Sequence, residues 1–210
     1  MRLLIATDAW RPQINGVVRS LEQMAEHAAA FGVETVFVTP LDFPSIPMPT
    51  YPEIRLSLAY PRNLARRIDA IAPTHIHIAT EGPIGFAVRS VCMSRGLPYT
   101  TSYHTRFPEY VSARARIPQE WTYGLIRRFH NAGCGIMVST PSLERELAGR
   151  GFAKLMRWTR GVDTQLFAPR GHSVLDCKGP VFLTVARLAV EKNLEAFLSL
   201  DLPGTKVVVG

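Results

Sequence analysis

Short apolar runs alternate with helical patterns along most of this chain. The first run, residues 2–7, is apolar at nearly every position, as expected of a strand that is buried on both faces of a sheet. A helical pattern follows over residues 17–28 and ends near Gly32, and the next apolar run covers residues 35–39. Strand, helix and strand in this order form a βαβ unit, which favours a parallel sheet covered by helices. We therefore expect an α/β fold with a doubly wound, mostly parallel sheet.

The alternation continues to residue 148. We expect further strands at 53–58, 76–79, 98–103 and 135–139, and further helices at 62–72, 83–94, 119–130 and 141–148. Five prolines between residues 40 and 52 predict an irregular surface loop there. His77 alternates with isoleucines, which favours a core histidine over a ligand.

The chain is long enough for one sizeable domain and part of another. Glycines and prolines give residues 169–179 the composition of a linker, so we expect a first domain over 1–168 and a second that begins at 180. Residues 180–210 predict a single βαβ unit, with strands at 181–186 and 206–209 and a helix at 190–200. One such unit cannot bury its own faces and edges, so we expect the second domain to be incomplete in these 210 residues.

The net charge is +7, which suggests polyanionic partners or a basic surface that maintains solubility, and both interpretations stay open. No interleaved aromatic and basic motif is present, so a nucleic-acid binder is disfavoured. Three widely spaced cysteines without a C-x-x-C pair indicate reduced thiols in a cytoplasmic protein. No apolar run approaches the ~20 residues of a spanning helix, although the chain could lie on a membrane surface.

Three segments place polar residues after predicted strands, where open α/β sheets bind their ligands. Asn15 and Gly16 follow the first strand, and His104 follows the strand at 98–103. Arg187 and Lys192 flank the turn after the strand at 181–186, where two cations and a helix N-terminus would favour a diphosphate. The G-x-G-x-x-G fingerprint is absent, which disfavours an ordinary Rossmann oxidoreductase.

Four motifs span nearly the whole chain: residues 12–17 (PQINGV), 103–110 (YHTRFPEY), 160–163 (RGVD) with Phe167, and 187–195 (RLAVEKNLE). With them the chain resembles the retaining glycosyltransferases of family four, and most of all the lipid-directed branch. That branch contains GDP-mannose-dependent α-mannosyltransferases and diacylglycerol glycosyltransferases. The resemblance implies the GT-B fold of two facing Rossmann-like domains, of which this chain would hold the first domain and the first βαβ unit of the second.

The resemblance also implies roles for single residues. The catalytic residues would be His104, Arg187 and Lys192; the donor phosphates would meet Gly16, Arg187 and Lys192; the acceptor would meet Asn15, Gly16, Thr105, Arg106 and Tyr110. Protein cations would neutralise the leaving diphosphate, so no metal or other cofactor is expected, and no D-x-D signature is present.

The implied activity is transfer of a hexosyl group, with retention, from a nucleotide-diphosphate sugar (GDP-mannose or a UDP-sugar) to a membrane lipid or glycan acceptor. The nucleotide-binding segment and paired-glutamate motif of the family's second domain are not among these residues, so we expect little activity from this truncated form. The alternative is a non-catalytic remnant or acceptor-binding module.

A basic helix with Arg62, Arg66 and Arg67 and the apolar loop at 43–51 suggest contact with the anionic inner face of the plasma membrane. A solvated helix face is the other interpretation of these arginines.

Overall fold

The computed structural model describes residues 1–13, 15–48, 51–109, 112, 117–169, 171, 175–177, 179–186, 188 and 192–210. They form two compact units, Met1–Gly161 and Val162–Gly210. The predicted linker at 169–179 and the predicted domain limits stay predictions. No helix in the described ranges is long and apolar enough to cross a membrane.

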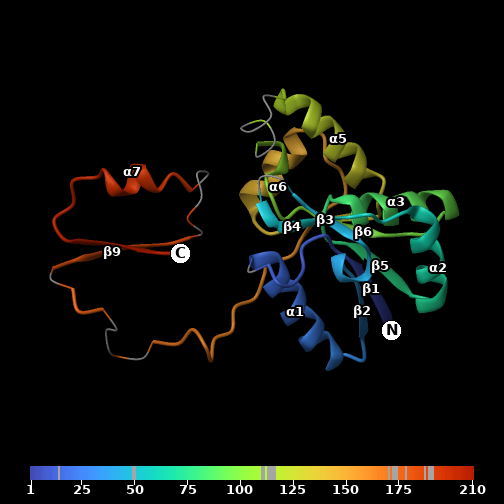
Figure 1. Ribbon diagram of the computed structural model, residues 1–210, viewed down its shortest axis with the longest axis horizontal. Coiled ribbons are helices and arrows are strands. Elements are labelled where there is room, and N and C mark those ends of the chain that lie inside the picture. Colours follow the sequence, from blue (N-terminus) through green and yellow to red (C-terminus); the bar gives the residue numbers. More distant parts are fainter. Residues whose placement is uncertain are drawn as a thin grey trace. The chain divides into compact units, whose positions relative to one another are not determined.

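The first unit is built on a sheet of six parallel strands in the order β2-β1-β5-β6-β7-β8 (Figure 1). The strands are β1 (Arg2–Ala6), β2 (Glu34–Val38), β5 (His75–Ile78), β6 (Thr100–Ser102), β7 (Gly135–Val138) and β8 (Leu155–Arg157). Because β2 lies on one side of β1 and β5 on the other, the strand order reverses at β1. The predicted doubly wound parallel sheet is confirmed, and it is consistent with the first Rossmann-like domain of a GT-B protein.

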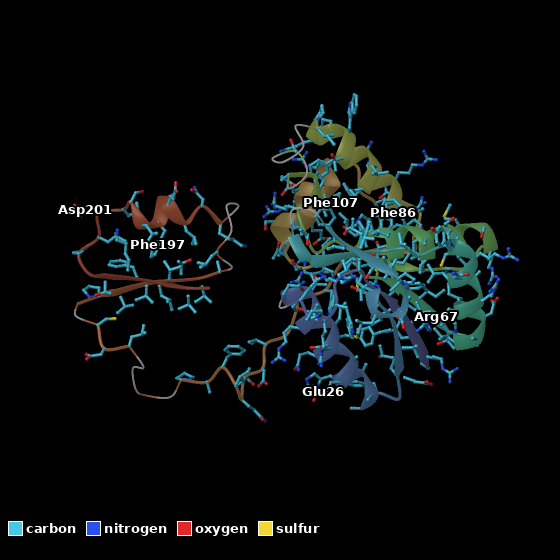
Figure 2. The ribbon with its side chains drawn as sticks, viewed as in Figure 1. Glu26, Arg67, Phe86, Phe107, Phe197 and Asp201 are labelled. Carbon is cyan, nitrogen blue, oxygen red and sulfur yellow. The ribbon has the colours of Figure 1, made fainter. Side chains whose placement is uncertain are left out.

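Five helices of the first unit cover the sheet. They are α1 (Gly16–Ala29), α2 (Pro61–Ile71), α3 (Pro83–Arg95), α5 (Gln119–Asn131) and α6 (Pro141–Gly149). Figure 1 shows α1 on one side of the sheet and α2 and α3 on the other. The core explains this arrangement, because Ile5 of β1 packs with α1 while Leu4 and Ala6 pack with α2 and α3. Phe86, labelled in Figure 2, packs from α3 against Phe129 of α5 with ring centroids 4.7 Å apart.

The segment predicted as an irregular loop is more ordered than expected, so that prediction was wrong in part. It contains a 3₁₀ helix, η1 (Pro40–Asp42), and the strand β3 (Ser45–Met48), which pairs antiparallel with β4 (Tyr51–Ser57). Proline is tolerated in β3 because this hairpin has two strands, so each keeps one edge that forms no ladder bonds. The strand β8 was not predicted at all.

The second unit contains β9 (Val181–Val185) and β10 (Thr205–Val209), which pair in parallel, and the helix α7 (Leu194–Leu198). Figure 2 shows Phe197 of α7 pointing towards the two strands. The predicted βαβ unit is confirmed, but α7 is much shorter than the helix predicted at 190–200. Asn193 has a left-handed backbone with φ of 46°, which excludes it from the helix.

Candidate functional site

The parallel sheet delivers His104 to its carboxyl edge, directly after β6. The backbone N–H of Tyr103 still bonds to Met137 O on β7 at 2.9 Å, so the strand direction is fixed up to the residue before the histidine. His104 is half-buried, and its ring meets that of Trp158 edge-on with centroids 6.0 Å apart. Trp158 is held in turn by a backbone bond to Val138.

The two ring nitrogens of His104 have different surroundings. Arg160 donates from Nη2 to His104 Nδ1 at 2.9 Å. A guanidinium can only donate, so Nδ1 accepts and the hydrogen of the neutral ring is on Nε2. His104 Nε2 is buried and has no hydrogen-bond partner in the described part of the chain.

Burial, together with smaller contributions from the charge of Arg160 and from the nearby His77 and His130, lowers the pKa of His104 to about 3. The imidazole is therefore neutral at physiological pH, and it presents one unused N–H. Burial also lowers the pKa of the Arg160 guanidinium.

Gly16 begins α1 and lies next to the same arginine. A Cβ atom at Gly16 would be 4.0 Å from Arg160 Nη1 and would meet nothing nearer. Asn15 is the N-cap of α1, and its Oδ1 accepts from the amides of Val17 and Val18 at 3.0 Å each. Its side-chain oxygen is thus engaged by the helix. Arg160 brings together Gly16 and His104, which are far apart in the sequence.

Asp8 follows β1, at the point of the sheet where the strand order reverses, and its carboxylate is bound there by the protein itself. Asp8 accepts from the amides of Ile84 (2.8 Å) and Gly85 (3.2 Å) at the N-terminus of α3, and from the Thr80 hydroxyl (2.9 Å). A Cβ atom at Gly82 would lie 2.3 Å from Asp8 Cγ, so this approach requires glycine. Burial raises the pKa of Asp8, while the bonds it accepts oppose that rise. The anion position at α3 is filled, whereas among the described residues no carboxylate caps α1 or contacts Arg160.

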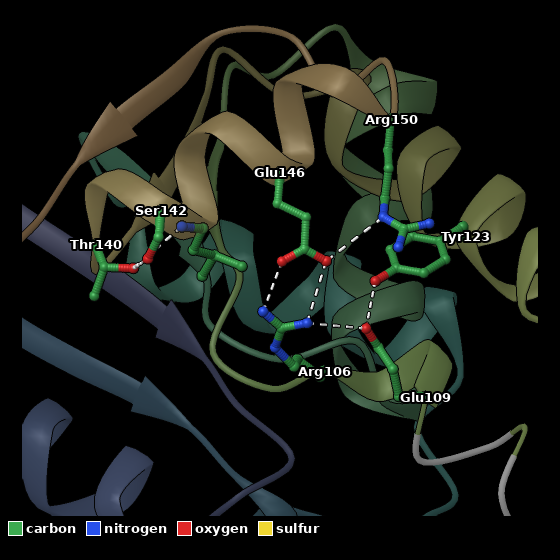
Figure 3. A network of polar contacts seen from close by, with 8 residues as sticks. Arg106, Glu109, Tyr123, Thr140, Ser142, Glu146 and Arg150 are labelled. Atoms are coloured by element: carbon green, nitrogen blue, oxygen red, sulfur yellow. Dashed lines mark hydrogen bonds and ion pairs between the residues drawn. The ribbon is translucent and has the colours of Figure 1, made fainter.

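Arg106 belongs to a polar network with carboxylates of the first unit (Figure 3). It binds Glu146 of α6 through both guanidinium ends, at 3.2 and 2.6 Å, and contacts Glu109 at 3.3 Å. Glu109 accepts from the Tyr123 hydroxyl at 2.6 Å, and Arg150 stacks on the Tyr123 ring at 3.9 Å. The charge of Arg106 is therefore already balanced by two carboxylates, a contact that the sequence did not predict.

Four predicted site residues remain, namely Thr105, Lys192, Arg187 and Tyr110. Thr105 is exposed beside His104, and its side chain forms no hydrogen bond within the described ranges. Lys192 is exposed in the second unit and has no ion-pair partner among the described residues. Arg187 and Tyr110 lie outside the described residues. The predicted facing of Lys192 and His104 stays a prediction.

The three arginines predicted to contact a membrane have different environments on α2. Arg62 and Arg66 are exposed, and the described residues give neither an ion pair. Arg67, labelled in Figure 2, is half-buried and pairs with Asp42 of η1 at 2.5 Å. Arg67 therefore serves the fold, whereas Arg62 and Arg66 stay available on this surface as far as the structure describes the chain.

Arg160 is the residue of this site to which the sequence assigned no role. The signal was the RGVD motif, which was noted for its resemblance only. Its place could not be derived, because it follows β8, a three-residue strand that was not predicted. Within the described ranges, no three His, Cys, Asp or Glu side chains gather closely enough to hold a metal ion.

Comparisons with known proteins agree with this fold and identify the family. The model of Glycosyltransferase Family 4 matches residues 14–166. The GDP-mannose-dependent alpha-mannosyltransferase of Mycobacterium tuberculosis is 25% identical over an alignment that covers 100% of this chain and 62% of the relative. Sulfoquinovosyl transferase SQD2 of Arabidopsis thaliana is 28% identical, covering 74% of this chain and 33% of its own length.

A second GDP-mannose-dependent alpha-mannosyltransferase, from Corynebacterium glutamicum, is 24% identical over 96% of this chain and 54% of the relative. The chain thus spans less than two thirds of the length of each of these relatives. The family model nevertheless covers most of the chain, including β6, His104 and Arg160. The resemblance drawn from the motifs is confirmed, and the chain belongs to Glycosyltransferase Family 4.

Proposed function

We propose that this protein transfers a hexosyl group, with retention, from a nucleotide-diphosphate sugar to a membrane lipid or glycan acceptor. The observation that carries the proposal is the unpartnered Nε2–H of a neutral His104, held by Arg160 beside the N-terminus of α1. A sugar hydroxyl is a neutral acceptor, and a neutral N–H donor at a strand end suits it.

Departure of the diphosphate is the step that most needs electrostatic help, because negative charge grows on the leaving group. The N-terminus of α1 favours a phosphate, and Gly16 allows the backbone to approach one. Arg160 adds a cation beside Gly16, and Lys192 is an exposed cation of the second unit with no ion-pair partner among the described residues. Arg187 keeps its predicted role beside Lys192. These protein cations are the reason for proposing that no metal or other cofactor takes part.

The names of the relatives support a hexosyl donor: two are named for GDP-mannose and one for sulfoquinovosyl transfer. A lipid acceptor rests on the sequence motifs, and Asn15, Gly16, Thr105 and Tyr110 remain its proposed contacts. For Arg106 we propose that it shapes the acceptor side by holding α6 in place through Glu146.

The exposed Arg62 and Arg66 support a further part of the proposal, contact with an anionic membrane from the cytoplasmic side. Exposed Tyr60, the N-cap residue of α2, and exposed Ile46 on β3 add apolar surface. Each free basic side chain near such a surface contributes about 1 kcal/mol of attraction.

The test is sugar transfer from GDP-mannose, UDP-glucose and UDP-glucuronate to diacylglycerol or glycolipid vesicles. It is run on the 210-residue chain, from which slight transfer at most is expected, and on the longest natural form that carries it. We expect His104→Ala to lower kcat at least ~100-fold, as loss of a well-placed donor does, with an unchanged circular dichroism spectrum. His27→Ala, at an exposed histidine of α1, should leave the rate unchanged.

Acceptor binding without transfer by any form would support the alternative, a non-catalytic acceptor-binding module. Full activity of His104→Ala would show that the site has been assigned to the wrong residue.

A further inference from the structure

The first unit holds three histidines close to the carboxyl half of the sheet, and their partners differ in kind. His77 bonds through Nδ1 to the Thr100 hydroxyl (2.8 Å) and through Nε2 to the Ser102 hydroxyl (2.9 Å). Hydroxyls both donate and accept, so these partners allow either tautomer of His77.

His130 bonds to the Thr101 hydroxyl (2.8 Å) and to a carboxylate oxygen of Glu81 (3.0 Å). Both of its nitrogens are therefore used. His104 differs from both, because one nitrogen is unused and the other meets a group that can only donate.

The hydrogen bond from Arg160 constrains the ring more tightly than a hydroxyl or a water could. A hydrogen on Nδ1 would point at the guanidinium N–H, which would lose a charge-assisted bond and bring two donors together. A hydrogen on both nitrogens would add a second positive charge beside Arg160. Only the tautomer with its hydrogen on Nε2 avoids both costs.

We propose that Arg160 is a positioning residue, which fixes the His104 ring as the tautomer that carries its hydrogen on Nε2. The inference rests on the proposed function only for the use of this N–H, which is proposed to bind the donor's sugar. Arg160 follows β8 and His104 follows β6, with β7 between them. The guanidinium therefore reaches back over the end of β7, which gives the short edge strand β8 a role in the site.

The proposal also predicts how His104 responds to pH. Burial is the largest cause of the lowered pKa of His104. The groups that face the ring, Arg160, His77 and His130, each lower it by a smaller amount. Loss of Arg160 should raise the pKa of His104 towards the ordinary value of about 6.5, without reaching it, because burial remains.

The test is nuclear magnetic resonance of the 210-residue chain with ¹⁵N-labelled histidine, without any substrate. Long-range ¹H–¹⁵N spectra distinguish a protonated ring nitrogen from an unprotonated one, and His104→Gln assigns the signals. In the wild type we expect Nδ1 unprotonated and Nε2 protonated between pH 6 and pH 8. In Arg160→Met both nitrogens should move towards averaged shifts, as the two tautomers exchange, and the pKa should rise.

Two further variants separate positioning from general damage to the fold. Arg160→Lys keeps a charged donor, so the wild-type tautomer should be restored at least in part. Arg157→Gln removes an arginine on β8 that pairs with Glu144 instead, and it should leave the His104 signals unchanged.

Two results would overturn the proposal: a wild-type spectrum with the hydrogen on Nδ1, or identical His104 spectra in Arg160→Met and the wild type. Neither result depends on transfer. If the spectra are as expected but no form of the protein transfers sugar, then the proposed function fails while the positioning role stands.

Discussion

Acid should destabilise the first unit through one buried histidine of the sheet, His77. Only 5% of this residue is exposed, and both of its ring nitrogens are bonded to hydroxyls of β6. Burial, with a smaller contribution from His130, lowers the pKa of His77 to about 4. The unfolded chain, with an ordinary pKa of about 6.5, therefore binds a proton in a pH range where the native state does not.

The direction of the effect follows from this difference in proton binding. Stability is unaffected by His77 above pH 7.5 and falls as the pH drops from about 6.5 towards 4. The two pKa values correspond to about 3 kcal/mol once both states are fully protonated, and to about 2 kcal/mol at pH 5.0. This is a large part of the stability of an ordinary domain.

The assay is urea unfolding followed by tryptophan fluorescence at pH 7.5 and pH 5.0. All three tryptophans, Trp10, Trp121 and Trp158, lie in the first unit, so the signal reports on that unit alone. His77→Gln keeps polar atoms for the hydroxyls but cannot titrate. Between the two pH values the wild type should lose about 2 kcal/mol more than His77→Gln does. Equal losses in the two proteins would refute the reasoning.

Two further predictions concern packing and the membrane surface. Gly85→Ala should lower the free energy of unfolding by about 3 kcal/mol, because the new Cβ would lie 2.0 Å from the backbone oxygen of Thr80. Gly124→Ala, in open space on α5, should raise it by about 0.5–1 kcal/mol. Urea unfolding measures both variants, and equal stability of the two would contradict the packing seen around α3. Arg62→Glu combined with Arg66→Glu should reduce sedimentation of the chain with anionic vesicles at low salt, and unchanged sedimentation would count against docking through α2.

The regular elements of the first unit could be predicted because their signals are local. Leu4, Ile5 and Ala6 of β1 are all completely buried, so three apolar residues in a row correctly indicated a strand with both faces covered. The helix predicted at 83–94 is α3, and Gly96 ends it with a left-handed backbone that glycine adopts easily. His77 was correctly expected in the core from its alternation with isoleucines.

The parts that were missed lack such signals. Strand β8 has three residues, of which Met156 and Arg157 are exposed, so no apolar run marks it. The strand β3 contains proline, which a strand tolerates only at the edge of a sheet. No local pattern in the sequence shows that β3 and β4 form a separate two-stranded hairpin. The ion pair of Arg106 with Glu146 could not be predicted from a local pattern either, because Glu146 lies 40 residues further along the chain.

Rules about strand ends therefore locate candidate residues without defining their chemistry. Such a rule placed His104 at the carboxyl edge, but it says nothing about which nitrogen carries the hydrogen. That state depends on Arg160, 56 residues away, and the same position with a hydroxyl partner would hold an imidazole free to change tautomer, as at His77. A histidine becomes a fixed donor only when its neighbour is unable to accept. The decisive property of this site is thus a contact between residues that follow β6 and β8, and the sequence marks the end of β6 but not that of β8.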